Sequence, residues 1–184
     1  MDDRLHVIRF APFSLDPTEE YDDTNDEKTA YATYGLAVYG ANCMEAALVN
    51  AFAMSKVISA RDEGRVLMTD PWAKGFKEAV KNLIPKVCHK AGADQRIVDD
   101  LLKAVDRRNF LIHRFWYERI TEMFNDNRRR RLIIELQHDH RLFKTMDDRL
   151  NSEVLTPLRD TLGFGQDLID AQMEIMRQGA QRDA

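Results

Sequence analysis

Two residues whose side chains could take part in catalysis, Asn109 and His113, lie four residues apart. An imidazole can both donate and accept a proton near neutral pH, which suits acid and base catalysis. Residues at positions i and i+4 share one face of a helix and can hydrogen-bond each other. Both interrupt an apolar stripe, where a buried polar group without a partner costs about 1–3 kcal/mol. The two therefore either carry chemistry or form a satisfied core pair that fixes the helix register.

Arginine is strongly enriched around this pair. Residues 107–131 contain eight arginines, three acidic residues and no lysine, a net charge of +5. The planar guanidinium can bind a phosphate through two parallel hydrogen bonds. For Arg128 to Arg131, the alternative interpretation is a solvated basic turn paired with the acidic residues of the N-terminal arm. The residues predicted to contact RNA are Arg107, Arg114, Arg128, Arg129, Arg130 and Arg131.

The segment from Arg108 through Asn109 to His113 resembles the Rx4-6H motif of HEPN domains, in which a polar residue directly follows the arginine. The surrounding arrangement is similar as well. A long helix is predicted before the motif, the motif lies within a later core helix, and a further helix follows. The resemblance covers roughly residues 27–160. HEPN domains are all-helical bundles, and many act as metal-independent endoribonucleases in toxin–antitoxin and phage-defence systems.

The resemblance implies RNA cleavage in which the 2′-hydroxyl of the RNA attacks the adjacent phosphate and leaves a 2′,3′-cyclic phosphate. It makes Arg108, Asn109 and His113 the catalytic residues. His113 would move the proton, and Arg108 would stabilise the negative charge on the phosphoryl oxygens. Asn109 would orient His113 or contact the phosphate. No metal and no other cofactor is expected.

The spacing of Arg108 and His113 poses a geometric problem for a single chain. Five residues on an ideal helix correspond to a rotation of about 500°, which directs the two side chains about 140° apart. Either the long arginine side chain wraps round the helix, or the helix is distorted, or a second chain completes the site. HEPN domains usually pair, so the resemblance favours the third and predicts a homodimer whose cleft takes residues from both copies. A protein antitoxin is a further candidate partner. Two alternatives remain open: a non-catalytic HEPN-like module that binds RNA or a protein, and a purely structural helical dimer.

Glu45 and a pair of histidines are weaker candidates. Glu45 lies in an otherwise apolar helix, where a buried carboxylate needs a partner, and Arg108 or His113 is the natural one. Glu45 then either positions a catalytic residue through this contact or forms an ordinary structural ion pair. His138 and His140 are two residues apart and face different sides of a helix, so we do not expect them to share a metal ion.

The elements that position these residues are predicted to be helices in an all-α bundle of four to five helices. The predicted ranges are 26–60, 73–89 with a kink or end at Pro85, 94–124, 128–157 ending at Pro157, and a tail helix over 166–176. The first helix has a narrow face of mostly small residues that would let another helix approach closely. This face consists of Leu36, Gly40, Cys43, Ala47, Ala51 and Met54.

The two helices around the motif have predicted core faces with residues three or four apart. In the helix over 94–124, this face consists of Leu102, Val105, Asn109, His113, Trp116, Ile120 and Phe124. In the last long helix, it consists of Leu132, Leu136, His140, Phe143, Leu150 and Val154.

Charge divides the 184-residue chain into two parts. Of the net charge of -4, residues 1–27 carry -7 and the remainder carries +3. We therefore predict an acidic N-terminal arm over 1–26, partly extended or flexible, and a helical HEPN-like domain over 27–184. The two cysteines show no CxxC spacing, and the N-terminus lacks a basic-then-apolar signal segment. These features predict a cytoplasmic protein with no membrane partner.

Overall fold

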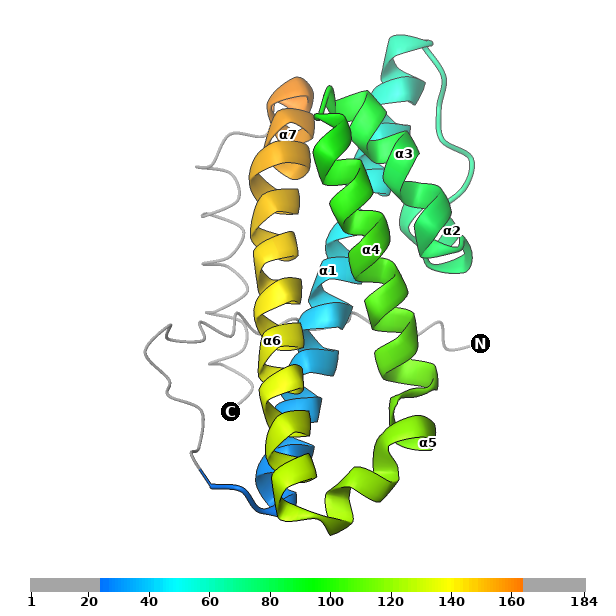
Figure 1. Ribbon diagram of the computed structural model, residues 1–184. Helices are drawn as coiled ribbons and strands as arrows, with labels where there is room; N and C mark the ends of the chain where they lie inside the picture. Colours follow the sequence, from blue (N-terminus) through cyan, green and yellow to red (C-terminus); the bar gives the residue numbers. More distant parts are fainter. Residues whose placement is uncertain (1–23, 164–184) are drawn as a thin grey trace, which may run out of the picture.

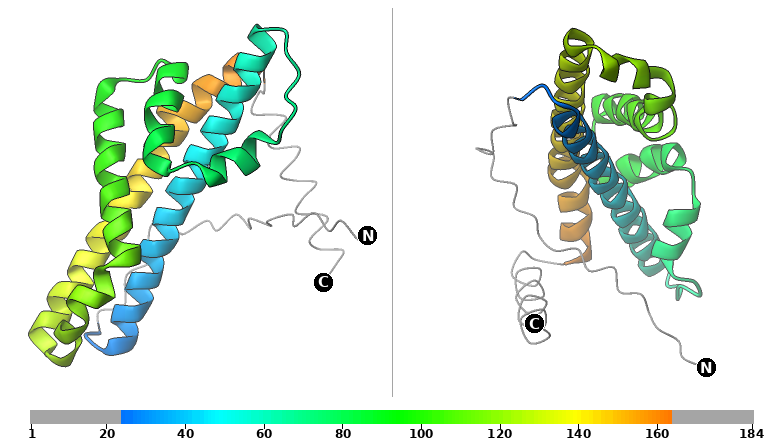
Figure 2. Two further views of the ribbon diagram at one scale, coloured as in Figure 1. Left: turned by 90° about the vertical axis from the view of Figure 1, so that its right-hand side faces the viewer. Right: turned by 90° about the horizontal axis from the view of Figure 1, so that it is seen from below.

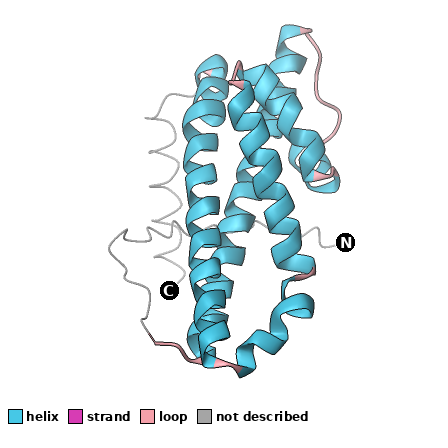
Figure 3. Cartoon of the chain, in the orientation of Figure 1, coloured by secondary structure: helices cyan, strands magenta, loops and turns pink. Residues whose placement is uncertain are grey.

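The computed structural model describes residues 24–163, and every regular element in this range is helical (Figure 1, Figure 3). The all-α prediction is confirmed. The predicted tail helix over 166–176 lies outside the described residues, as does the predicted acidic arm apart from residues 24–26. The elements are α1 (Glu27–Asp62), α2 (Pro71–Lys77), α3 (Val80–Ala91), α4 (Gln95–His113), α5 (Phe115–Arg119), the 3-10 turn η1 (Ile120–Phe124), α6 (Asp126–Leu150), the π-helical turn η2 (Asn151–Leu155) and α7 (Thr156–Leu162).

The long helices α1 and α6 lie side by side and run in the same direction through the bundle (Figure 1, Figure 2). Gly40 lies at their contact, where a Cβ atom would be 3.3 Å from the Cβ of Phe143. The prediction of close approach along a small-residue face is confirmed at this point. The predicted face is only partly buried, however. Gly40, Ala47 and Ala51 are buried, whereas Leu36, Cys43 and Met54 are half-buried.

The apolar composition of α1 matches its place in the bundle. This helix is long and apolar enough to cross a membrane by length and composition alone. However, 56% of its most apolar window is buried inside the structure. A helix that is buried on most of its surface is expected to be apolar on most sides.

The helix predicted over 73–89 is two helices, α2 and α3. Glu78 and Ala79 between them have extended backbone, with ψ of 143° and 127°. Gly75 brings α2 close to α1, because a Cβ there would be 3.0 Å from the Cγ1 of Val49. Pro85 lies inside α3 and does not end it, contrary to one of the predicted outcomes.

The helix predicted over 94–124 ends early, at His113. Arg114 has φ of -127° and ψ of -22°, and the chain continues in a new direction as α5 and η1 (Figure 1). The predicted core face is therefore wrong beyond the break, because helical spacing no longer relates residues on its two sides. Ile120 is 39% exposed and Phe124 is 80% exposed. The buried face of α4 consists of Ile97, Leu101, Ala104, Val105 and Leu111.

The last helical rod extends beyond its predicted end. Pro157 has no N–H to donate, and the π-helical turn η2 precedes it, so that α6 continues through η2 into α7. The predicted core face of this rod is confirmed for its apolar members. Leu132, Leu136, Phe143, Leu150 and Val154 are buried, whereas His140 is half-buried.

Candidate active site

Arg108 is held by Glu45, the partner that the sequence predicted, and by its neighbour Asn109, which the sequence had paired with His113 instead. Its Nη2 atom forms an ion pair with the Oε2 atom of Glu45 in α1, and its Nη1 atom donates a hydrogen bond of 3.0 Å to Oδ1 of Asn109. The Arg108 side chain is 18% exposed and that of Glu45 is 27% exposed. The prediction that Glu45 has Arg108 or His113 as its partner is confirmed for Arg108.

One donor of Arg108 remains unused. Its Nε atom is buried and has no hydrogen-bond partner among residues 24–163. An unsatisfied buried donor costs about 1–3 kcal/mol, and more when the group is charged. The guanidinium is thus fixed in position on one side while one of its N–H groups still lacks an acceptor.

His113 lies at the exposed end of α4. It is the last residue of that helix, and its side chain has no hydrogen-bond or ion-pair partner within the described part of the chain. The predicted core pair with Asn109 is wrong, because Asn109 accepts from Arg108 and His113 faces solvent. Arg108 faces α1, so the two ends of the predicted motif do not converge within one copy.

An aromatic cluster fixes the end of α4 against the first half of α1. The hydroxyl of Tyr34 donates a hydrogen bond of 3.2 Å to the carbonyl of Leu111, in the last turn of α4. The Tyr34 ring lies 5.5 Å from Phe115 and 5.0 Å from Trp116, measured between ring centroids. Burial raises the pKa of Tyr34, so its hydroxyl stays a donor at neutral pH. These contacts set where His113 emerges from the bundle, and the sequence analysis did not identify Tyr34.

Two of the arginines in the basic stretch belong to a network of ion pairs that joins α4, α5 and η1 to α6. Arg107 donates to both carboxylate oxygens of Asp139, at 2.7 and 2.6 Å, and to Glu135 at 2.7 Å. Arg119 donates to Glu135 at 2.6 Å and lies 2.6 Å from Glu122. The network is largely shielded from solvent, and Asp139 is 2% exposed. The sequence analysis missed Asp139 and Arg119, whose partners lie on separate helices.

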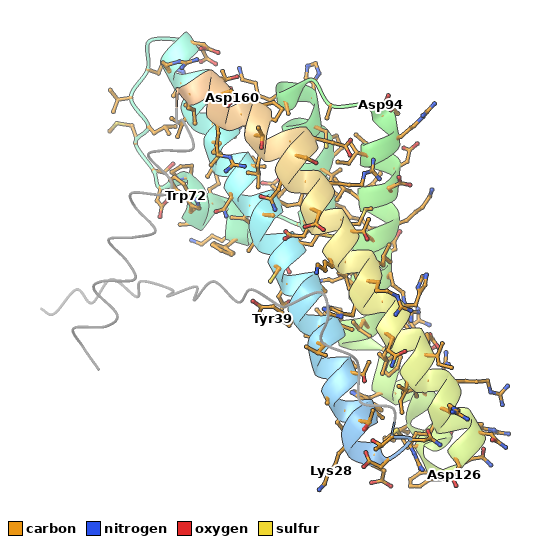
Figure 4. All side chains as sticks on the ribbon, turned by 90° about the vertical axis from the view of Figure 1, so that its left-hand side faces the viewer. Lys28, Tyr39, Trp72, Asp94, Asp126 and Asp160 are labelled. Atoms are coloured by element: carbon orange, nitrogen blue, oxygen red, sulfur yellow. The ribbon has the colours of Figure 1, made fainter. Side chains whose placement is uncertain are left out.

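Arg129 ties the beginning of α6 to the residues before α1. Its guanidinium donates to the carbonyls of Asn25 and Met123 and to the carboxylate of Asp126, each at 2.7 Å. Figure 4 shows Lys28 of α1 and Asp126 of α6 at this same end of the bundle. Together with the network above, this contact uses three arginines for structure. We call Arg107, Arg119 and Arg129 the inner arginines.

The remaining members of the Arg128–Arg131 run lie at the surface. Among the described residues, no carboxylate pairs with any of their side chains. Arg114 is also exposed, but it donates to Glu118 at 2.8 Å one turn further along the chain. The basic stretch is therefore divided between structural and solvent-facing side chains. We call Arg128, Arg130 and Arg131 the outer arginines.

The two histidines of α6 have different surroundings. His138 is exposed, whereas His140 is half-buried beside Gly40. Burial lowers the pKa of His140, and the charges of Lys144 and Arg141 lower it further. Within residues 24–163, no three histidine, cysteine, aspartate or glutamate side chains come together as metal ligands.

Comparisons with known proteins give no relative for this chain. No family model matches its sequence, and no curated protein and no solved structure matches it either.

Proposed function

We propose that the chain is a HEPN-like, metal-independent endoribonuclease of a toxin–antitoxin or phage-defence type, acting in the cytoplasm as a homodimer. One observation carries the proposal: His113 stands exposed at the end of α4, with no partner among residues 24–163, five residues after an arginine held by Glu45 and Asn109. An exposed histidine can reach a substrate proton, and a fixed guanidinium can stabilise charge without reorganising during the reaction.

The proposed reaction is the one that the resemblance to HEPN domains implies. The 2′-oxygen of the RNA forms a bond to the adjacent phosphorus as the bond to the 5′-oxygen breaks. His113 of one copy accepts the proton of the 2′-hydroxyl and then donates a proton to the leaving 5′-oxygen. Arg108 of the second copy stabilises the charge on the phosphoryl oxygens. Asn109 positions Arg108 through its 3.0 Å hydrogen bond, a role that differs from the orientation of His113 or the phosphate contact expected from the sequence. The products are a 2′,3′-cyclic phosphate and a 5′-hydroxyl.

A second copy is part of the proposal because Arg108 and His113 face different sides of α4. The outward face of α1 supports pairing. From residue 29 to residue 55 this helix carries a single charged residue, Glu45, which is already paired with Arg108. Tyr39, at the middle of the outward face, is 43% exposed and lies on the outer side of α1 (Figure 4). An uncharged helix face is well suited to pack against an identical face across a two-fold axis.

The Glu45 contact also favours a second candidate function. A carboxylate beside Arg108 reduces the positive charge that a scissile phosphate would meet. A non-catalytic HEPN-like module that binds RNA or a protein, such as an antitoxin, needs no such charge at Arg108. The purely structural dimer has less support, because the Asn109–His113 pair on which it depended is not formed.

The test is RNA cleavage by the purified protein in the presence of a chelator. Wild type is expected to cut a mixed-sequence RNA and leave cyclic phosphate ends. His113→Ala is expected to slow cleavage by about 10²–10⁴-fold, the usual contribution of acid–base catalysis. His138→Ala is the matched control, since His138 is also an exposed histidine on a long helix. RNA binding without cleavage would favour the non-catalytic module. Equal cleavage by wild type and His113→Ala would reject the proposed mechanism.

A further inference from the structure

A pocket lies at the end of the bundle where α6 begins, and only some of the outer arginines line it. It has a volume of about 500 Å³ and is lined by Arg119, Glu122, Arg128 and Arg131. Residues 128 and 131 are three apart in α6, so they lie on one face of the helix. Arg130 is not part of the lining, although it is exposed and belongs to the same run. One turn of helix thus places two of the outer arginines in the pocket and one outside it.

Among residues 24–163, the positive charge of the lining exceeds the negative charge paired with it. Arg119 is already paired with Glu122 and Glu135, at 2.6 Å from each. No carboxylate pairs with Arg128 or Arg131 within the described residues, and the one side-chain contact of Arg131 is a 3.4 Å approach to a backbone carbonyl. Three arginines and one glutamate give the lining a net charge of +2. A pocket of this charge favours a small, doubly charged anion over a neutral ligand.

We infer that this pocket binds a phosphate monoester dianion, through Arg128 and Arg131. A monoester carries a charge of about -1.5 to -2 at neutral pH and three strong acceptor oxygens. Guanidinium groups bind such oxygens in bidentate pairs. An internal phosphodiester offers a single charge and two free oxygens, so it matches the lining less well. The ligand is the terminal phosphate of an RNA or a free phosphate, and binding does not depend on whether the chain cleaves RNA.

The test measures binding of two oligonucleotides of one sequence to the full-length protein. Both carry 2′-O-methyl groups, so they cannot be cut by 2′-hydroxyl attack, and they differ only in a 5′-phosphate or a 5′-hydroxyl. We expect the 5′-phosphorylated form to bind about tenfold more tightly. Arg128→Ala and Arg131→Ala should each remove most of that difference, because each loses a charge-assisted contact. Inorganic phosphate is titrated separately by calorimetry to identify a free phosphate as the ligand.

Arg130→Ala is the matched control, because it removes the same charge from the same helix outside the pocket. It should retain the preference for the 5′-phosphate. Arg128→Lys keeps the charge but loses the bidentate geometry, so it should show an intermediate preference. Inorganic phosphate binding that depends on Arg128, without discrimination between the oligonucleotides, would assign the pocket to free phosphate. If Arg130→Ala weakens every probe as much as Arg128→Ala and Arg131→Ala do, the attraction is diffuse and the pocket site is rejected.

Discussion

The inner and outer arginines come from one basic stretch of sequence, but the inner ones pair within the structure and the outer ones face solvent. Arg107, Arg119 and Arg129 each reach at least two acceptors, and their partners come from α6, η1 and the residues before α1. Arg128, Arg130 and Arg131 have no carboxylate partner among the described residues. The net charge of +5 over residues 107–131 therefore overstates the charge available to a ligand. Arg107 and Arg129 are taken up by carboxylates and backbone carbonyls, whereas the outer arginines are left for an anionic ligand.

The contrast predicts where substitutions will affect folding and where they will affect binding. Removing one partner of a buried ion pair leaves an uncompensated charge, which is strongly destabilising. An exposed arginine without a partner can be removed with little change in stability. The predictions below follow this division.

The largest effect is expected from Asp139→Ala, which leaves Arg107 without two of its three hydrogen bonds to carboxylates. We expect the free energy of unfolding to fall by about 3 kcal/mol, measured by urea denaturation. Asp148→Ala removes an exposed aspartate from the same helix and should change stability by less than about 0.5 kcal/mol. Similar losses in the two variants would show that the inner network does not stabilise the fold.

A smaller effect is expected on RNA affinity when two outer arginines are removed together. Arg128→Ala combined with Arg130→Ala should weaken binding of a single-stranded RNA about tenfold at 0.1 M salt, because two phosphate contacts are lost. The slope of affinity against salt should fall by about 1.4. Removing the exposed Lys74 and Lys77 of α2 changes the net charge equally and serves as the control. If both double variants lose the same affinity, the outer arginines have no special role.

The two histidines of α6 also differ in burial: His140 is half-buried and His138 is exposed. Burial lowers the pKa of His140, followed by the charges of Lys144 and Arg141. The folded state thus binds this proton less tightly than the unfolded state, so stability falls as the pH drops through the ordinary imidazole value of 6.5. His140→Gln should reduce the loss of stability between pH 7 and pH 5. An equal or greater loss of stability in His140→Gln would contradict the effect of burial on His140.

The smallest effect is expected for the exposed ion pair of Arg114 with Glu118. Pairs of this kind contribute about 0.3–0.5 kcal/mol, since water and salt screen them. Arg114→Ala should therefore shift the unfolding free energy by no more than about 0.5 kcal/mol. A loss as large as that of Asp139→Ala would mean that an exposed ion pair stabilises the fold as much as a shielded one.

The sequence predicted those features that depend on a single helix or on one strong chemical requirement. A carboxylate in an apolar helix needs a cation, and this requirement identified Arg108 as a possible partner of Glu45. The all-helical architecture and the apolar core positions of α6 also followed from periodicity. Periodicity succeeded because it depends on residues close together along the chain. The Glu45 prediction succeeded because burying an unpaired carboxylate costs too much free energy.

The sequence did not predict the break at Arg114 or the sorting of the arginines. No glycine or proline marks the end of α4, and apolar residues continue at helical spacing through Trp116 and Ile120. His113 therefore looked buried, although it is exposed. Arg128 to Arg131 are chemically identical, and Arg129 differs because two of its acceptors are the backbone carbonyls of Asn25 and Met123. Backbone atoms of distant residues leave no pattern in the side-chain sequence.

The central proposal is that a second copy completes a metal-free RNA cleavage site. It is tested most directly by mixing the inactive variants Arg108→Ala and His113→Ala in chelator and measuring cyclic phosphate ends. A composite site predicts that the mixture recovers cleavage, since a mixed dimer holds one intact Arg108 and one intact His113 from different chains. Subunit exchange is verified with differently tagged copies. If mixed dimers form and cleave no faster than either variant alone, while wild type cleaves, the composite site is wrong.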